Sequence, residues 1–236
     1  MLFLLICFII MYLFRIVETV AFIAGLIVYK TIKPAFLKPI VFLLAITVLN
    51  ECMIIPYFIS LKKNYNNYSY NVFTFIDMAI WFYVFYKINT KPSIRYFIIA
   101  SAIVSFLYSF IELTFLNDWR HLHCDSMRLY GLIIIFLSAC YFYQVMLKPY
   151  HNIFNDSIFW ICAGCFLFHL ILFINLTTLA NAKYWNLKSA GFVQHLLQNI
   201  AIFCYYCCIT IGFILCYYSN YLETKQKSRQ DFTMVQ

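Results

Sequence analysis

Long apolar runs separated by short polar breaks dominate the pattern along the chain. Each run spans about 20 residues or more, the length that an α-helix needs to cross the hydrocarbon core of a bilayer. Strands of a membrane barrel would be about 10 residues long and would alternate in polarity. The pattern therefore predicts seven membrane-spanning helices, over residues 2–30, 37–61, 70–88, 94–116, 127–147, 157–179 and 191–218.

Composition agrees with this pattern and excludes a soluble domain. The chain is 64% hydrophobic and 11% charged, whereas soluble domains carry about 25% charged residues. The first apolar run lacks the basic start and small-residue cleavage site of a signal peptide, so we interpret it as a retained first span. We predict an all-α polytopic membrane protein with a seven-helix domain over residues 1–219 and a short cytoplasmic tail over 220–236.

Basic residues lie in short loops at the ends of the apolar runs, which is typical of membrane topology and not of nucleic-acid binding. One side of the predicted bundle carries ten of them and the other side six. The ten are Lys30, Lys33, Lys38, Lys87, Lys91, Arg95, Lys148, Lys225, Lys227 and Arg229. The six are Lys62, Lys63, Arg120, Arg128, Lys183 and Lys188. Because cytoplasmic loops are enriched in Lys and Arg, we expect the N-terminus outside and the C-terminus inside.

Polar side chains gather in the predicted outer half of the bundle. A carboxylate inside a membrane span is costly unless it is protonated, paired or facing water, so it indicates a functional site. Glu51 and Asp77 are the predicted charged anchors, and His169 and His195 the hydrogen-bonding or titrating groups. We predict an outward-facing ligand-binding cavity formed by Asn50, Glu51, Asn71, Thr74, Asp77, His169, Gln194, His195, Gln198 and Asn199. The alternative is that these side chains only join helix to helix by hydrogen bonds.

The predicted outer loop before the fifth span contains four residues able to bind Zn or Cu, namely His121, His123, Cys124 and Asp125. A tetrahedral site usually draws ligands from two separate segments, so the metal hypothesis is weak. A loop that clamps the mouth of the cavity is the favoured interpretation.

Catalytic signatures are sparse, and we predict no cofactor and no catalytic residue. Cysteines spaced as Cys162 and Cys165, or as Cys204 and Cys207, share a helix face, but buried apolar thiols are inert. We interpret them as small packing residues, with a membrane enzyme that uses them as an open alternative.

Three short patterns resemble a known group of proteins. Glu18 precedes the run Ala-Gly-Leu-Ile-Val-Tyr-Lys30, Asn50 and Glu51 lie in the second span, and Asn71 to Asp77 enter the third. The combination resembles a group of uncharacterised bacterial seven-helix membrane proteins. The resemblance implies the fold and a bacterial cytoplasmic membrane, and it implies no activity.

The one-sided placement of polar groups favours a sensor or receptor-like protein that binds a small ligand or a cation. A transporter needs access from both faces, and the inner halves of the spans are nearly all apolar. A transporter or channel, including a proton-coupled one, is the alternative. The expected partners are the lipid bilayer and an unidentified small molecule or ion, and no nucleic acid. Self-association or a membrane partner is left open.

Overall fold

The computed structural model describes residues 2–60, 66–116, 119, 121–147, 152–185 and 190–234. Within these ranges, side chains are described for 15–58, 67–178 and 196–219, and for Tyr221, Leu222 and Lys225. The described chain is helical, without a β-strand. Its elements are α1 Leu2–Val28, η1 Ala35–Leu37, α2 Lys38–Leu49, η2 Asn50–Ile54, α3 Ile55–Ser60, α4 Asn66–Ile88, α5 Pro92–Ile111, η3 Glu112–Leu116, α6 Cys124–Met146, η4 Ile153–Asn155, α7 Ser157–Trp185 and α8 Ala190–Met234.

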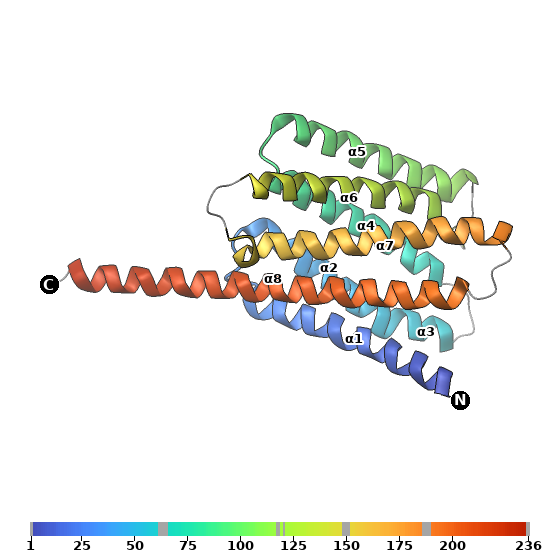
Figure 1. Cartoon of the computed structure of the whole chain (residues 1–236), viewed down its shortest axis with the longest axis horizontal. Helices are drawn as coiled ribbons and strands as arrows, with labels where there is room; N and C mark the ends of the chain where they lie inside the picture. The colour runs from blue at the N-terminus through green and yellow to red at the C-terminus, as the bar shows by residue number, and fades with distance from the viewer. Residues whose placement is uncertain are drawn as a thin grey trace.

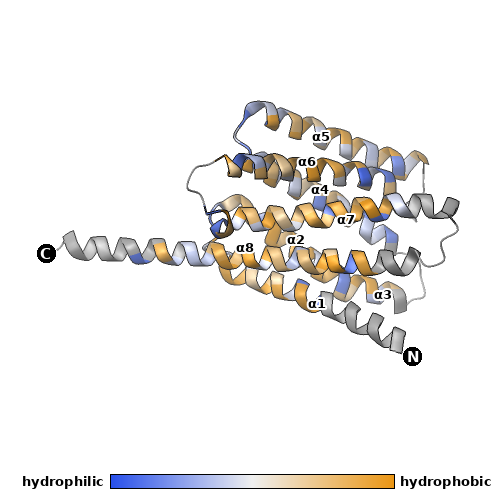
Figure 2. Cartoon of the chain, viewed as in Figure 1, coloured by the Kyte–Doolittle hydropathy of each residue, from blue (hydrophilic) through white to orange (hydrophobic). Residues whose placement is uncertain are grey.

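Several of these helices have the length and hydropathy of membrane spans. Six described stretches qualify: Ala35–Phe58, Asn67–Ile88, Pro92–Leu116, Cys124–Met146, Ser157–Thr178 and Leu196–Ser219. They lie side by side in a bundle, with hydrophobic residues along most of their length (Figures 1 and 2). The structure thus has the architecture of a helical, multi-pass membrane protein. The second span is built from α2, η2 and α3 in succession.

The last helix is longer than the sequence pattern predicts. Helix α8 continues to Met234, through most of the stretch that we predicted as a tail, and projects beyond the bundle (Figure 1). Residues 219–234 contain no glycine or proline, the two residues that break helices most strongly. Hydropathy marks where the apolar run stops, but it does not mark where the helix stops.

Helices α7 and α8 approach each other closely at two glycines. A Cβ atom on Gly164 would lie 2.8 Å from Cβ of Cys208, and one on Gly212 would lie 2.6 Å from Cγ1 of Ile161. Small residues let backbones approach in lipid, where van der Waals packing drives helix association. Every described cysteine is a free thiol.

The bundle has two unlike ends. We call the end where α4 and α6 finish the packed half, because Phe85 and Phe213 are fully buried there. Trp81, also fully buried, lies next to Phe85 with ring centroids 6.1 Å apart. We call the end where α4 and α6 begin the cavity half, for the feature described next.

Candidate functional site

A cavity of about 420 Å³ lies in the cavity half, between the second span, α4, α6, α7 and α8. Each helix contributes residues three, four or seven positions apart, the spacing that places side chains on one helix face. Leu44, Thr47 and Glu51 on the second span and Gln198, Ile202 and Tyr205 on α8 follow this spacing. The other described lining residues are Leu43, Asn67, Tyr70, Phe73, Thr74, Asp77, Leu122, Met127, Tyr130, Phe168, His169, Leu172 and Tyr206.

Glu51 reaches the cavity from η2, a π-helical turn. Here the N–H of Ile55 donates to the carbonyl of Asn50 five residues earlier. Pro56, in the helix that follows, has no N–H to donate to a carbonyl of the preceding turn. Single π turns occur often at functional sites. The hydroxyl of Tyr70 on α4 donates to Oε1 of Glu51 at 2.9 Å.

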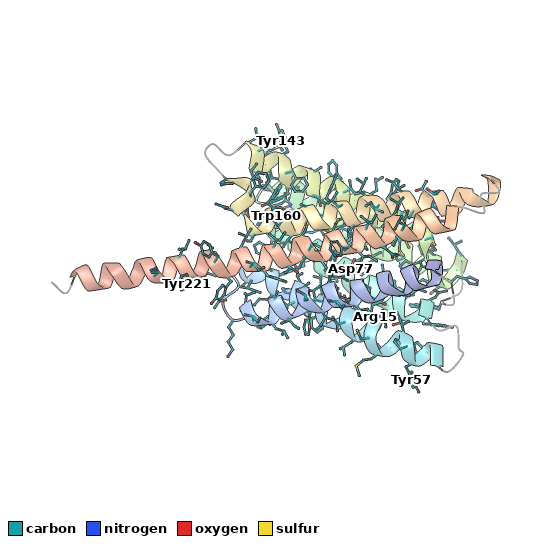
Figure 3. All side chains as sticks on the ribbon, turned by 60° about the horizontal axis from the view of Figure 1, so that its bottom comes forward. Arg15, Tyr57, Asp77, Tyr143, Trp160 and Tyr221 are labelled. Atoms are coloured by element: carbon teal, nitrogen blue, oxygen red, sulfur yellow. The ribbon has the colours of Figure 1, made fainter. Side chains whose placement is uncertain are left out.

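Asp77 on α4 also lines the cavity, and it lies among the helices of the bundle (Figure 3). The hydroxyl of Tyr130 on α6 donates to its Oδ2 at 2.9 Å. The Tyr130 ring meets His169 of α7 edge to face, with centroids 5.2 Å apart. Asp77, Tyr130 and His169 therefore bring three helices together at the cavity wall.

His169 has one satisfied and one unsatisfied ring nitrogen. Its Nδ1 lies 2.9 Å from the carbonyl oxygen of Cys165, and because a carbonyl only accepts, Nδ1 carries the proton. The neutral ring then has a bare lone pair on Nε2, which is buried without a hydrogen-bond partner in the described structure. The Sγ atom of Cys165 lies 3.6 Å from Nδ1. A protonated Nδ1 cannot accept the thiol proton, so this contact does not support the enzyme alternative.

Thr74 and Gln198 complete the polar part of the wall. The Thr74 hydroxyl donates to the carbonyl of Tyr70 at 2.8 Å, and Asn175 donates to Oε1 of Gln198 at 2.9 Å. The structure thus brings five of the ten predicted site residues to one cavity: Glu51, Thr74, Asp77, His169 and Gln198.

Three other predicted residues, Asn50, Asn71 and Asn199, do not line this cavity. Asn50 is buried and accepts a hydrogen bond from the Ser69 hydroxyl. Asn71 lies on a different face of α4, because each step of three residues turns a helix about 60° short of a full turn, so that Asn71 and Asp77 differ by about 120°. The structure therefore does not bring these three residues to the cavity that Glu51 and Asp77 line. The side chains of the remaining two, Gln194 and His195, lie outside the described residues.

Asn71 holds the loop before α6. Its amide donates to the carbonyls of Trp119 and His121, each at 3.0 Å, and its Oδ1 lies 2.8 Å from Nδ1 of His123. Burial lowers the pKa of His123 below its ordinary value. Glu112, also buried, accepts the N–H groups of Asp125 and Ser126 in the first turn of α6.

The metal hypothesis gains no support from this geometry. The described residues contain no group of three or more His, Cys, Asp or Glu side chains placed to hold an ion. Among the four candidate ligands, His123 contacts Asn71, Asp125 pairs with Arg128, His121 is exposed and Cys124 is partly buried. The loop is attached to α4 through Asn71, and its role as a clamp at the cavity mouth stays a prediction.

Sequence reasoning did not place Tyr70, Tyr130 or Glu18 at the candidate site. Tyr70 was available to it, since it precedes Thr74 by four residues and Asp77 by seven. Glu18 on α1 is 3% exposed and its Oε1 has no hydrogen-bond partner in the described structure. It interacts electrostatically with Glu51 and with Arg15. No sequence signal relates α1 to η2 in this way.

Comparison with known proteins brings no relative. No family model, no curated protein and no solved structure matches the chain. The resemblance to bacterial seven-helix proteins therefore stays a prediction.

Proposed function

We propose that the chain is a membrane sensor or receptor-like protein that binds a small ligand or a cation in a cavity facing outward. One observation carries the proposal: Glu51, Asp77 and His169, from three different spans, line a single cavity of about 420 Å³. Small-molecule sites are mostly apolar cavities of about 300–1,000 Å³ with a few converging polar groups. Carboxyl groups in a membrane span are costly, so their convergence on a cavity favours a functional role.

The proposal also includes the number of spans, the orientation of the termini and the membrane in which the chain lies. Helix α1 is proposed as a seventh span, because its 27 residues measure about 40 Å at 1.5 Å each and it packs along α2 and α8. The excess of Lys and Arg on one side supports an external N-terminus and an internal C-terminus. The bacterial cytoplasmic membrane is proposed from the sequence resemblance alone.

A sensor is favoured over a transporter by what lies beyond the cavity. The packed half fills the space toward the opposite face with buried aromatic side chains, including Trp81, Phe85 and Phe213. Transport requires that a site be reached alternately from both faces. A receptor requires one opening, which fits a cavity in one half of the bundle and buried aromatic side chains in the other.

Cysteine labelling tests the proposal. Single cysteines replace Glu51, Thr74, Asp77 and Gln198 in a variant without the ten native cysteines, and intact cells are treated with a membrane-impermeant maleimide. We expect labelling from outside at all four positions. Ser138→Cys is the matched control, because Ser138 is fully buried and should stay unlabelled. Protection of all four cavity positions would overturn the proposal.

A flux measurement separates the sensor from the transporter. Purified protein in sealed liposomes should bind a ligand without moving it across the bilayer. Ligand-dependent flux that Glu51→Gln abolishes would instead establish transport and refute the sensor.

A further inference from the structure

Acidic side chains outnumber basic side chains around the cavity. Its described lining residues include the acids Glu51 and Asp77 and no lysine or arginine. Behind Glu51, Glu18 and Arg15 interact with it electrostatically. Three carboxyl groups therefore accompany one guanidinium group. Clefts with one dominant sign of charge concentrate ligands of the opposite sign, so this cavity disfavours anions.

The two acids differ in their surroundings. Arg15 is a counter-charge for Glu51, whereas among the described residues no basic group acts on Asp77, which has only neutral neighbours such as Tyr130. An ionised Asp77 in this position lacks a positive partner. Buried charges in proteins are paired or hydrogen-bonded in nearly all cases, so a cationic ligand would supply what the chain itself does not.

Aromatic rings make up much of the remaining wall. Phe168 and Tyr205 lie with centroids 5.1 Å apart, and Tyr205 and Tyr206 with centroids 5.0 Å apart. Tyr130, Tyr205 and Tyr206 are all within electrostatic range of Asp77. Ring faces attract cations, most strongly where water is excluded. A carboxyl group beside several aromatic rings is a surrounding that suits an organic ammonium ion.

A metal ion fits the same wall poorly. Calcium takes about six to eight oxygen ligands, and zinc takes about four nitrogen, sulfur or oxygen ligands. The described residues hold no such group, and Leu43, Leu172 and Ile202 line the cavity instead. Apolar side chains suit the hydrocarbon body of an organic cation.

His169 provides a second, independent observation. It lines the cavity, it is 1% exposed, and its Nε2 lone pair has no donor within the described structure. Buried acceptors usually have a donor. Neighbouring atoms cover Nε2 itself, so a ligand would reach it only after a small turn of the ring. An ammonium N–H group is a donor that could then meet the lone pair, whereas a carboxylate or an ether oxygen is not.

Resting on the proposed function, we propose that the cavity binds an organic ammonium ion with an apolar body. Asp77 balances the charge of this ion, and the rings of Tyr130, Phe168 and Tyr205 surround it. Glu51, already accompanied by Arg15, contributes to the negative potential at the cavity.

Two series of matched probes test the charge requirement on the purified full-length chain. The aromatic series is phenethylamine, phenethyl alcohol and hydrocinnamate, and the aliphatic series is hexylamine, hexanol and heptanoate. Within a series the apolar body is similar and the charge is positive, absent or negative. A ligand that binds only the folded state raises Tm with concentration. We expect at least one amine to raise Tm, and its neutral and anionic counterparts to have little effect.

Substitutions test whether Asp77 and Tyr205 are the residues that bind the amine. Asp77→Asn keeps an acceptor for Tyr130 and removes the charge, and it should weaken the amine at least about tenfold. Asp125→Asn is the matched control, because Asp125 is exposed and pairs with Arg128 outside the cavity. If Asp77→Asn does not fold, Tyr205→Phe and Tyr205→Leu decide the matter. The phenylalanine variant keeps a ring and should keep amine binding, and the leucine variant should lose most of it.

The outcomes distinguish this inference from the proposed function. Equal stabilisation by amines, alcohols and acids overturns the cation inference and leaves a ligand-binding cavity. Stabilisation by none of the probes, with Thr74→Cys still labelled from outside, also overturns the cation inference alone. No stabilisation together with no labelling overturns both.

Discussion

Asn89 in the packed half and the acids of the cavity half differ in how their hydrogen bonds are satisfied. In the packed half, Asn89 is fully buried, donates to the carbonyl of Phe85 at 2.9 Å and accepts from Gln144 at 2.8 Å. In the cavity half, Glu51 accepts a hydrogen bond from Tyr70, and Asp77 accepts one from Tyr130. Nε2 of His169 has no partner in the described structure. The first arrangement stabilises helix packing, and the second keeps polar groups available at a cavity.

The difference between the two halves follows from the properties of lipid as a solvent. Lipid tails satisfy no polar group, so a buried amide in a membrane bundle is stable only when other helices supply its partners. A carboxyl group that a bundle leaves incompletely matched lowers stability. Such groups are retained where they bind or titrate. The comparison predicts that substitutions in the packed half affect folding and that substitutions at the cavity affect binding.

The largest expected effect on folding is that of Phe85→Ala in the packed half. Phe85 is fully buried against Trp81, and removing a buried ring leaves a void whose walls lose their packing contacts. We expect the free energy of unfolding to fall by about 3 kcal/mol or more, measured by denaturant titration of the purified protein in micelles. Phe115→Ala is the matched control, because Phe115 is 77% exposed and should change little. Equal effects of the two variants would contradict the assignment of a packed half.

Glu112→Gln should have the second largest effect on folding. Glu112 is buried, and its two carboxylate oxygens accept the N–H groups of Asp125 at 3.2 Å and of Ser126 at 2.7 Å. An amide has one acceptor oxygen, and its NH₂ group would face a backbone donor. We expect a loss of about 2 kcal/mol in the free energy of unfolding. Asp125→Asn removes only a partly exposed ion pair and should cost about 0.5 kcal/mol or less. Wild-type stability of Glu112→Gln would show that α6 does not depend on this carboxylate.

His123 gives a smaller effect that depends on pH. Because burial lowers the pKa of His123 in the folded state, the unfolded chain takes up the proton first. The contribution of neutral His123 to stability is complete above its unfolded pKa of about 6.5 and is lost as the pH falls below that value. One proton gives a slope of at most about 1.4 kcal/mol per pH unit. The free energy of unfolding between pH 7.5 and 5 should show this slope in the wild type.

Two variants test whether His123 causes this dependence of the free energy of unfolding on pH. His123→Asn keeps a donor for Oδ1 of Asn71 without titrating, so its slope should be lower. His121→Asn is the control, because His121 is exposed and should keep the wild-type slope. An unchanged slope in His123→Asn would assign the pH dependence to other groups.

Asp77→Asn has the smallest expected effect on folding. Asparagine still accepts from Tyr130, and the cost of holding a carboxylate in a membrane span disappears. We expect the free energy of unfolding to be unchanged within about 0.5 kcal/mol or to rise, as is common when functional groups are replaced. A fall as large as that of Phe85→Ala would show that Asp77 is a packing residue and would remove the difference between the two halves.

Most of the fold could be predicted from the sequence, because in lipid a run of about 20 apolar residues has one stable solution, the helix. The prediction located the described spans to within a few residues at most of their ends. It failed at the end of α8, where hydropathy changes but helix propensity does not. A span count of seven and the orientation of the termini are still predictions.

The candidate site was predictable only in part. Sequence alone identified Glu51 and Asp77, because a carboxyl group in an apolar run is conspicuous wherever it lies in the bundle. It could not show that Asp77 and Asn71 have different surroundings. Asp77 lines the cavity, whereas Asn71 bonds to the loop before α6. This difference depends on how α4 is rotated against its neighbours. It gave no sign that Glu18 interacts with Glu51 or that Tyr130 donates to Asp77. Those pairings join residues far apart in the chain, so only the packing of the helices decides them.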